Sequence, residues 1–177
     1  MTTIILIAAN GPDRVGLVAA VTGRLYDLGL NLGDTTFAVL GTGYEFRSIA
    51  DLPAGVNPSQ LLTELRAVPE LAASSVEVQA FGHRADRALS GRSTHRIRLT
   101  GGDQPGLIAR ITEAFVEFGA NIVRLNAERA PGANRNTYVT DFEVAIPAAR
   151  TDACLATVAN TAGELQLACT VEAAPAR

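Results

Sequence analysis

The sequence contains no lysine, and all 15 of its basic residues are arginines. It therefore has no lysine side chain with which to form a Schiff base with a carbonyl substrate or pyridoxal phosphate, and none for a Walker-type phosphate-binding loop. Tryptophan is also absent, aromatic residues make up 5% of the chain, and the formal net charge is −3. Nucleic-acid-binding proteins need positive charge and stacking surfaces. We therefore expect no direct contact with nucleic acid.

Cysteine and histidine are scarce, with two of each. These are too few for a zinc site of the usual spacing, and we expect Cys154 and Cys169 to be inert, since free cysteines are commonly buried. The apolar run at residues 4–9 is too short to span a membrane, and no basic segment precedes it as in a secretory signal. The sequence predicts a cytoplasmic protein with no cofactor, metal or membrane contact.

The sequence also contains an internal repeat. Residues 13–18 match residues 103–108 at an offset of 90, and the same offset aligns residues 28–32 with residues 118–122. Farther along the chain the offset becomes 94, so the second copy carries about four extra residues. We place them in an expanded loop at residues 131–136. Two blocks that agree on one offset predict two domains of the same fold.

The domain boundaries follow from this repeat. We expect a first domain over residues 1–82, a linker over residues 83–93 and a second domain over residues 94–177. The linker is polar and lacks periodicity. The first domain holds four arginines against eight acidic residues, a formal charge of −4, which favours a protein partner over a nucleic acid.

Each copy predicts the element order βαββαβ. In the first copy we expect strands at residues 4–7, 32–40, 44–52 and 75–80, and helices at residues 13–28 and 58–67. In the second copy the later strands fall at residues 122–130, 137–146 and 169–173, and the last helix at residues 151–161. This order is typical of an α+β ferredoxin-like fold, in which two helices cover one face of an antiparallel sheet.

Specific residues mark the two ends of the first helix in each copy. Asp13 and Asp103 stand where a carboxylate can cap free backbone N–H groups. Gly29 and Gly119 follow the last turn, where a left-handed residue commonly ends a helix.

These motifs resemble the ACT domain, a small regulatory module that binds amino acids. The resemblance rests on the D-x-x-G-L loop after the first strand, on the helix that ends in glycine, and on the asparagine two residues farther on. The segments 31–34, 38–41 and 45–46 are also similar to the first domain of the glycine cleavage system transcriptional repressor group. The resemblance implies two tandem ACT domains in an amino-acid-responsive regulator, not an enzyme. Such a protein would regulate the transcription of genes for glycine or amino-acid metabolism, through contact with a second regulatory protein. Open sheet edges favour a homodimer.

The resemblance also implies a ligand site between ACT domains, with glycine or serine as the suspected ligand. Each loop delivers a helix N-terminus, whose free N–H groups and positive dipole favour a carboxylate. In amino-acid-binding ACT domains, the residues that match the aspartate and the asparagine contact the ligand. The candidate ligand-binding residues are Asn10, Gly11, Asp13, Arg14, Gly16, Leu17 and Asn31 in the first domain, and Gly102, Asp103, Gln104, Gly106, Leu107 and Asn121 in the second.

Each of these residue types also has a purely structural interpretation. The aspartates can cap their helices, the asparagines can brace the turn between helix and strand, and Gly16 and Gly106 can allow close helix–sheet packing. The two copies are also unequal, because Gln104 replaces Arg14 and Pro105 replaces Val15. The ACT pattern often has a polar or basic residue at the positions of Gly11 and Gly101. The differences at Gly11 and Val15 favour the second domain as the ligand-binding one.

Three other functions remain open. The chain can be an ACT interaction module that binds no ligand. It can be an acylphosphatase-like enzyme, which would use Arg14 with Asn10 or Asn31. It can also be an RNA-recognition module on the same topology, for which the third strand offers only Tyr44 and Phe46 as stacking residues.

Overall fold

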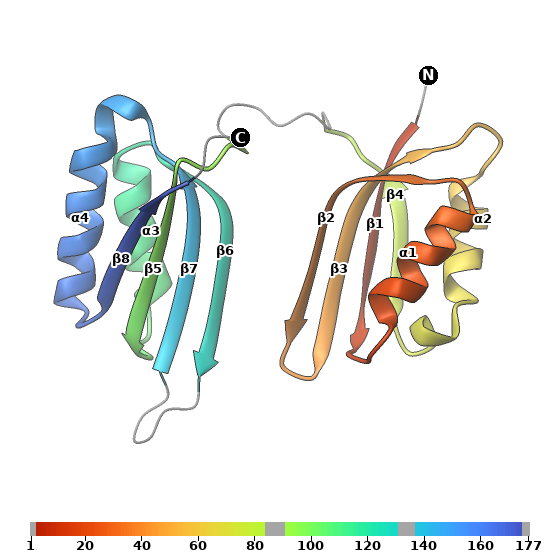
Figure 1. Cartoon of the computed structure of the whole chain (residues 1–177), viewed down its shortest axis with the longest axis horizontal. Coiled ribbons are helices and arrows are strands. Elements are labelled where there is room, and N and C mark those ends of the chain that lie inside the picture. The colour runs from red at the N-terminus through yellow and green to blue at the C-terminus, as the bar shows by residue number, and fades with distance from the viewer. Residues whose placement is uncertain (1–2, 84–90, 131–136, 175–177) are drawn as a thin grey trace. The chain divides into compact units, whose positions relative to one another are not determined.

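The computed structural model describes residues 3–83, 91–130 and 137–174 (Figure 1). The chain divides into two compact units, Met1–Asp86 and Arg87–Arg177. In each unit two α-helices cover one face of a four-stranded antiparallel sheet. The prediction of two α+β ferredoxin-like domains in tandem is confirmed. Most of the predicted linker and the whole predicted loop at residues 131–136 lie outside the described residues.

The two units repeat the same order of elements. The first contains β1 (Thr3–Pro12), α1 (Leu17–Asp27), β2 (Asn31–Leu40), β3 (Gly43–Leu52), α2 (Pro58–Arg66), η1 (Pro69–Leu71) and β4 (Ser75–Ala80). The second contains β5 (His95–Gly102), α3 (Leu107–Glu117), β6 (Asn121–Ala130), β7 (Thr137–Ala145), η3 (Ala148–Arg150), α4 (Thr151–Glu164) and β8 (Ala168–Ala173). The strand orders are β2-β3-β1-β4 and β6-β7-β5-β8, so β1 and β5 are central strands.

The first helix of each unit begins later than the sequence predicted. Gly16 (φ +88°) and Gly106 (φ +81°) adopt the left-handed conformation at the N-cap, so α1 begins at Leu17 and α3 at Leu107. Neither N-cap has a side-chain hydrogen bond. The interpretation of Asp13 and Asp103 as helix caps is therefore wrong.

The ends of these helices agree with the sequence. Gly29 and Gly119 have φ values of +77° and +67°. The Gly29 N–H donates to the Tyr26 carbonyl at 2.8 Å, and the Leu30 N–H donates to the Leu25 carbonyl at 3.0 Å. The same two bonds close α3 at 3.1 and 2.9 Å. This arrangement satisfies carbonyl groups at the helix end and ends both helices after 11 residues.

The strands alternate between a buried face and an open face. In β1, Ile5 and Ile7 are fully buried on the side of the helices, and Leu6 lies between them on the open side. Tyr44 and Phe46 of β3 are 3% and 0% exposed within the same core. Neither ring can stack on a base from the open face, so the structure removes the basis of the RNA-recognition alternative.

The two cores differ in where the third strand of the sheet places its ring. Phe46 and Ser48 are buried in β3, whereas Thr140 and Phe142 are buried at the matching rows of β7. The Ser48 hydroxyl shares a 2.8 Å hydrogen bond with the Thr35 hydroxyl. Among the described residues, the Thr140 hydroxyl is the buried side-chain group that has no hydrogen-bond partner. Removing such a group from water costs free energy, and no hydrogen bond within the protein offsets that cost.

We expect Thr140→Val to stabilise the second domain, because valine keeps the shape of the side chain and removes the hydroxyl. The free energy of unfolding should rise by about 1 kcal/mol, measured by urea denaturation followed by circular dichroism. Thr140→Ser is the matched control: it keeps the hydroxyl and loses a methyl group, and should lower stability by about 1 kcal/mol. A loss of stability in Thr140→Val would contradict the conclusion that the buried Thr140 hydroxyl has no hydrogen-bond partner within the described residues.

Candidate functional site

The β1–α1 loop of the first domain is exposed to solvent. The Asp13 N–H donates to the Thr42 carbonyl at 3.0 Å, which ties the loop to the β2–β3 turn. The side chains of Asp13 and Arg14 are both exposed, and neither has a side-chain partner among the described residues. Leu17, by contrast, is 1% exposed and belongs to the core. The polar groups of this loop are free to meet a ligand, and Leu17 only anchors the helix.

The matching loop of the second domain is held by contacts within the domain. The Asp103 carboxylate forms an ion pair with Arg129 of β6 at 2.9 Å. The Gln104 side chain donates to the Leu165 carbonyl at the end of α4, at 2.8 Å. The first copy has Val39 where the second has Arg129, so it lacks this ion pair. Arg129 is not among the site residues predicted from the sequence. The one available signal was the alignment of the two repeats, in which Arg129 of the edge strand β6 replaces Val39.

The candidate glycines fall into two kinds. A Cβ atom at Gly16 or Gly106 would have no atom within 4 Å, so the interpretation that these glycines allow close packing is wrong. Glycine is favoured at both positions because the backbone there has a positive φ. Gly11 is different, because a Cβ there would lie 2.5 Å from the Ser74 Oγ and 2.9 Å from its Cα. Gly102 has open space around it. Gly11 is therefore a packing residue of the β1–β4 end of the sheet.

The structure does not bring Asn31 to the loop of its own domain. Asn10 lies in β1, not in the loop, and pairs with Glu45, whereas Asn31 opens β2 and pairs with Asp51. Six residues of extended strand separate these two positions on β3, about 20 Å. Arg14 and Asn31 thus cannot act on one substrate in one domain, which removes that form of the acylphosphatase alternative.

The second domain repeats this separation. Asn121 pairs with Ala145, and Gly102 pairs with Thr137 at the other end of β7, about 26 Å away by strand geometry. The predicted residues therefore form two groups at opposite ends of each sheet. A ligand that touches both groups needs residues from two domains.

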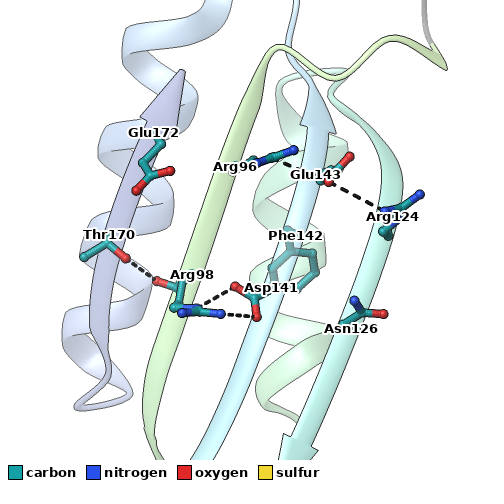
Figure 2. Close-up of a pocket in the computed structure, with 9 residues that line it drawn as sticks. All are labelled: Arg96, Arg98, Arg124, Asn126, Asp141, Phe142, Glu143, Thr170 and Glu172. Carbon is teal, nitrogen blue, oxygen red and sulfur yellow. Dashed lines mark hydrogen bonds and ion pairs between the residues drawn. The ribbon is translucent and has the colours of Figure 1, made fainter. Parts of the chain in front are cut away.

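A separate cavity of about 500 Å³ lies on the open face of the second sheet (Figure 2). It shares no residue with the predicted site. Its lining comes from all four strands and consists of Arg96, Arg98, Arg124, Asn126, Asp141, Phe142, Glu143, Thr170 and Glu172. The sequence did contain a signal for this surface, since arginine alternates with aliphatic residues over 96–99 and acid alternates with apolar residues over 141–144.

Among the described residues, ion pairs already occupy five of the six charged groups of this cavity, all except Glu172. Arg98 donates from two guanidinium nitrogens to the two Asp141 oxygens at 2.7 and 2.9 Å. This hydrogen bond and the charge of Asp141 raise the pKa of Arg98 above its ordinary value. Glu143 lies 3.5 Å from Arg96 and 3.9 Å from Arg124. With three arginines and three acidic residues, the lining of the cavity has no formal net charge.

The described residues offer little for metal or covalent chemistry. Within them, no group of three histidine, cysteine or acidic residues lies close enough to hold a metal ion. Burial raises the pKa of both Cys154 and Cys169, which lowers the fraction of reactive thiolate at neutral pH. None of the helices in the described part of the chain has the length and apolar character needed to cross a membrane.

Comparisons with known proteins are informative mainly about fold. No family model matches the chain. A UPF0237 protein of Streptococcus mutans is 29% identical over 75 residues, which span 42% of this chain and 85% of that protein.

Two crystal structures match nearly the full length. One is an unknown protein from Galdieria sulphuraria, with a TM-score of 0.75, 20% identity and coverage of 98% of this chain and 99% of the other. The second is a candidate glycine cleavage system transcriptional repressor, with a TM-score of 0.68, 14% identity and coverage of 98% of both chains. The chain has the same tandem ferredoxin-like fold as these two structures, as expected of two ACT domains. The resemblance to the repressor group is thus confirmed as a likeness of fold, and each unit is called an ACT domain below.

The packing of Gly11 generates a prediction with a matched control in the same ACT domain. Gly11→Ala should lower the free energy of unfolding by about 1–3 kcal/mol, because the new methyl group collides with the Ser74 backbone. Gly23→Ala, in the exposed middle of α1 with no atom within 4 Å, should raise it by about 1 kcal/mol. Urea denaturation measures both, and a neutral Gly11→Ala would show that Ser74 moves away without cost.

Proposed function

We propose that the chain is an amino-acid-responsive regulatory protein that binds a small amino acid, glycine or serine, at the β1–α1 loop of its first ACT domain. It then regulates the transcription of genes for amino-acid metabolism through contact with another protein. The observation that carries this proposal is the start of α1. A left-handed glycine without a side-chain cap leaves the first N–H groups of that helix available to a ligand carboxylate.

The helix N-terminus favours the carboxylate end of an amino acid. The dipole of an exposed helix is worth about 0.3–1 kcal/mol to an anion at this position. Gly16 contributes no side chain that would cover the N–H groups, and a Cβ there would meet only open space. A small ligand can therefore approach the backbone directly.

The exposed side chain of Asp13 supports recognition of the ammonium end. Asp13 has no side-chain partner among the described residues, whereas Asp103 is already paired with Arg129 at 2.9 Å. A carboxylate without a partner gains more from an ammonium group than one that is already neutralised. These contacts favour the first ACT domain as the ligand-binding one, the opposite of what the sequence differences favoured.

Asn31 enters this proposal only through a second ACT domain. It lies about 20 Å from Asn10 along the strand direction, so an asparagine equivalent to Asn31 can reach this ligand only from another ACT domain, in the same chain or in a second copy. A ligand held by two domains would stabilise their association, and it could shift that equilibrium only by its difference in affinity for the two states.

The occupied loop of the second ACT domain favours a different function there. Its aspartate and glutamine are both bonded within the domain, as expected of a module that binds no amino acid. The two ACT domains would then divide the work, with ligand recognition in the first and protein contact in the second.

Isothermal titration calorimetry of the full chain tests the ligand proposal. Glycine or L-serine should bind at micromolar to millimolar concentration. Asp13→Asn keeps the shape of the side chain and removes its charge, and should weaken binding at least tenfold, about 1.4 kcal/mol. Asp103→Asn should leave the affinity nearly unchanged, because Arg129 already neutralises that carboxylate.

Asp27→Asn provides the matched control, since Asp27 is also an exposed aspartate of this domain but lies at the opposite end of α1. It should bind like the unmodified chain. Absence of binding by any amino acid at millimolar concentration would reject the sensor function and leave the interaction module. Equal losses in Asp13→Asn and Asp103→Asn would reject the assignment to the first domain.

A further inference from the structure

The open face of the second sheet carries its charges in ordered rows. Strand pairing places Glu172, Arg96, Glu143 and Arg124 side by side in the order β8-β5-β7-β6. Signs therefore alternate along this first row, minus, plus, minus, plus. The helices cover the other face of the sheet, and Figure 2 shows the labelled charged side chains on the open side.

A second row follows two residues along the strands. It places Thr170, Arg98, Asp141 and Asn126 side by side. Its two charged groups lie on the central strands β5 and β7, again with plus on β5 and minus on β7. Both rows thus have the same order of signs at the centre of the sheet.

The first ACT domain does not share this pattern. Its central strand has Leu6 and Ala8 at the positions of Arg96 and Arg98, and Ile49 stands where the second domain has Glu143. The open face of the first sheet carries other charges instead, including the Arg47–Glu45 ion pair of β3. The alternating rows are therefore a property of the second ACT domain.

We propose that this face binds the same face of a second copy of the chain, about a two-fold axis that runs parallel to the strands between β5 and β7. Such an axis lays β5 of one copy over β7 of the other and β8 over β6. Arg96 then faces Glu143 of the second copy, and Glu172 faces Arg124 of the second copy. Arg98 faces Asp141 of the second copy in the same way, and every contact occurs twice.

The charge rows also select this axis over the other face-to-face arrangement. A two-fold axis across the strands would lay β5 over β5, so that Arg96 would meet Arg98 of the second copy. Glu143 would likewise meet Asp141 of the second copy. Like charges in direct opposition are unfavourable, whereas the axis along the strands opposes only unlike charges.

The same groups argue against a small anion as the occupant of the cavity. Each arginine already has a carboxylate within 4 Å, and Arg98 holds Asp141 through two bonds. A free anion would have to displace these pairs. A second copy keeps them and adds one oppositely charged neighbour to each group, across the spacing of about 10 Å that separates packed sheets.

The size of the face sets the expected strength of the contact. Four strands of about eight residues cover roughly 500 Å² on each copy, near the lower limit of about 1,000 Å² in total for a specific interface. The charged side chains are also partly exposed, with side-chain exposures of 47% for Arg96 and 24% for Glu143. The dimer should therefore be concentration-dependent and weakened by salt.

Sedimentation velocity of the full chain, without any amino acid, tests this interface. In about 50 mM NaCl the chain should dimerise as its concentration rises, and about 500 mM NaCl should weaken the dimer at least tenfold. Arg96→Glu and Glu143→Arg should each be monomeric, because each places like charges opposite each other twice. An equimolar mixture of the two variants should dimerise again, since both contacts between the two chains then oppose unlike charges, one with the native signs and one with the signs reversed.

Two further sets of variants separate this result from loss of folding. Arg124→Glu and Glu172→Arg lie at the ends of the row, where Arg124 is 3.9 Å from Glu143, and should show the same pattern with less effect on the fold. Arg110→Glu and Glu164→Arg reverse the charges of an exposed ion pair on the helices of the same domain and should dimerise normally.

The outcome is independent of the proposed ligand function, because calorimetry measures that function and sedimentation measures this one. A wild-type chain that stays monomeric at low salt and high concentration would overturn the proposal. So would a dimer that survives Arg96→Glu and Glu143→Arg, or a mixture of folded variants that fails to associate.

Discussion

The alternation of side chains along the central strands β1 and β5 is the constraint on which both ACT domains depend. Antiparallel pairing on both sides fixes the register of these strands, so every second residue points to the helices and the others point away. The helix side must be apolar, and it holds Ile5 and Ile7 in one domain and Ile97 and Leu99 in the other. The opposite side carries no such requirement, and there Leu6 and Ala8 of one copy stand where the other has Arg96 and Arg98.

Left-handed glycines impose the second constraint, because they limit the first helix of each domain to 11 residues. The helix returns along the sheet, and the loop before it and the asparagine after it lie at opposite ends of the strands. The residues predicted to contact an amino acid are thereby divided between two places. A ligand that contacted both groups of residues would therefore couple its own recognition to the association of two domains.

The fold was predictable because its signals are local and occur twice. The offset of 90 residues, the strand patterns and Gly29 with Gly119 each indicated the structure that is observed. The start of the first helix was not predictable in the same way, because an aspartate followed by a glycine three residues later fits either a capped helix or an exposed loop. The candidate site was only partly accessible, since the pairing of Asp103 with Arg129 and the distance between Asn10 and Asn31 depend on tertiary register.

The open face of the second sheet also has a consequence for how such a chain can change. Substitution of Arg96 or Arg98 leaves the buried Ile97 and Leu99 in place, so the chemistry of that face is separable from folding. The charge pattern of this face can therefore change by single substitutions while the core stays intact. The first ACT domain, with Leu6 and Ala8 at the same positions, already shows two solutions coexisting within one chain.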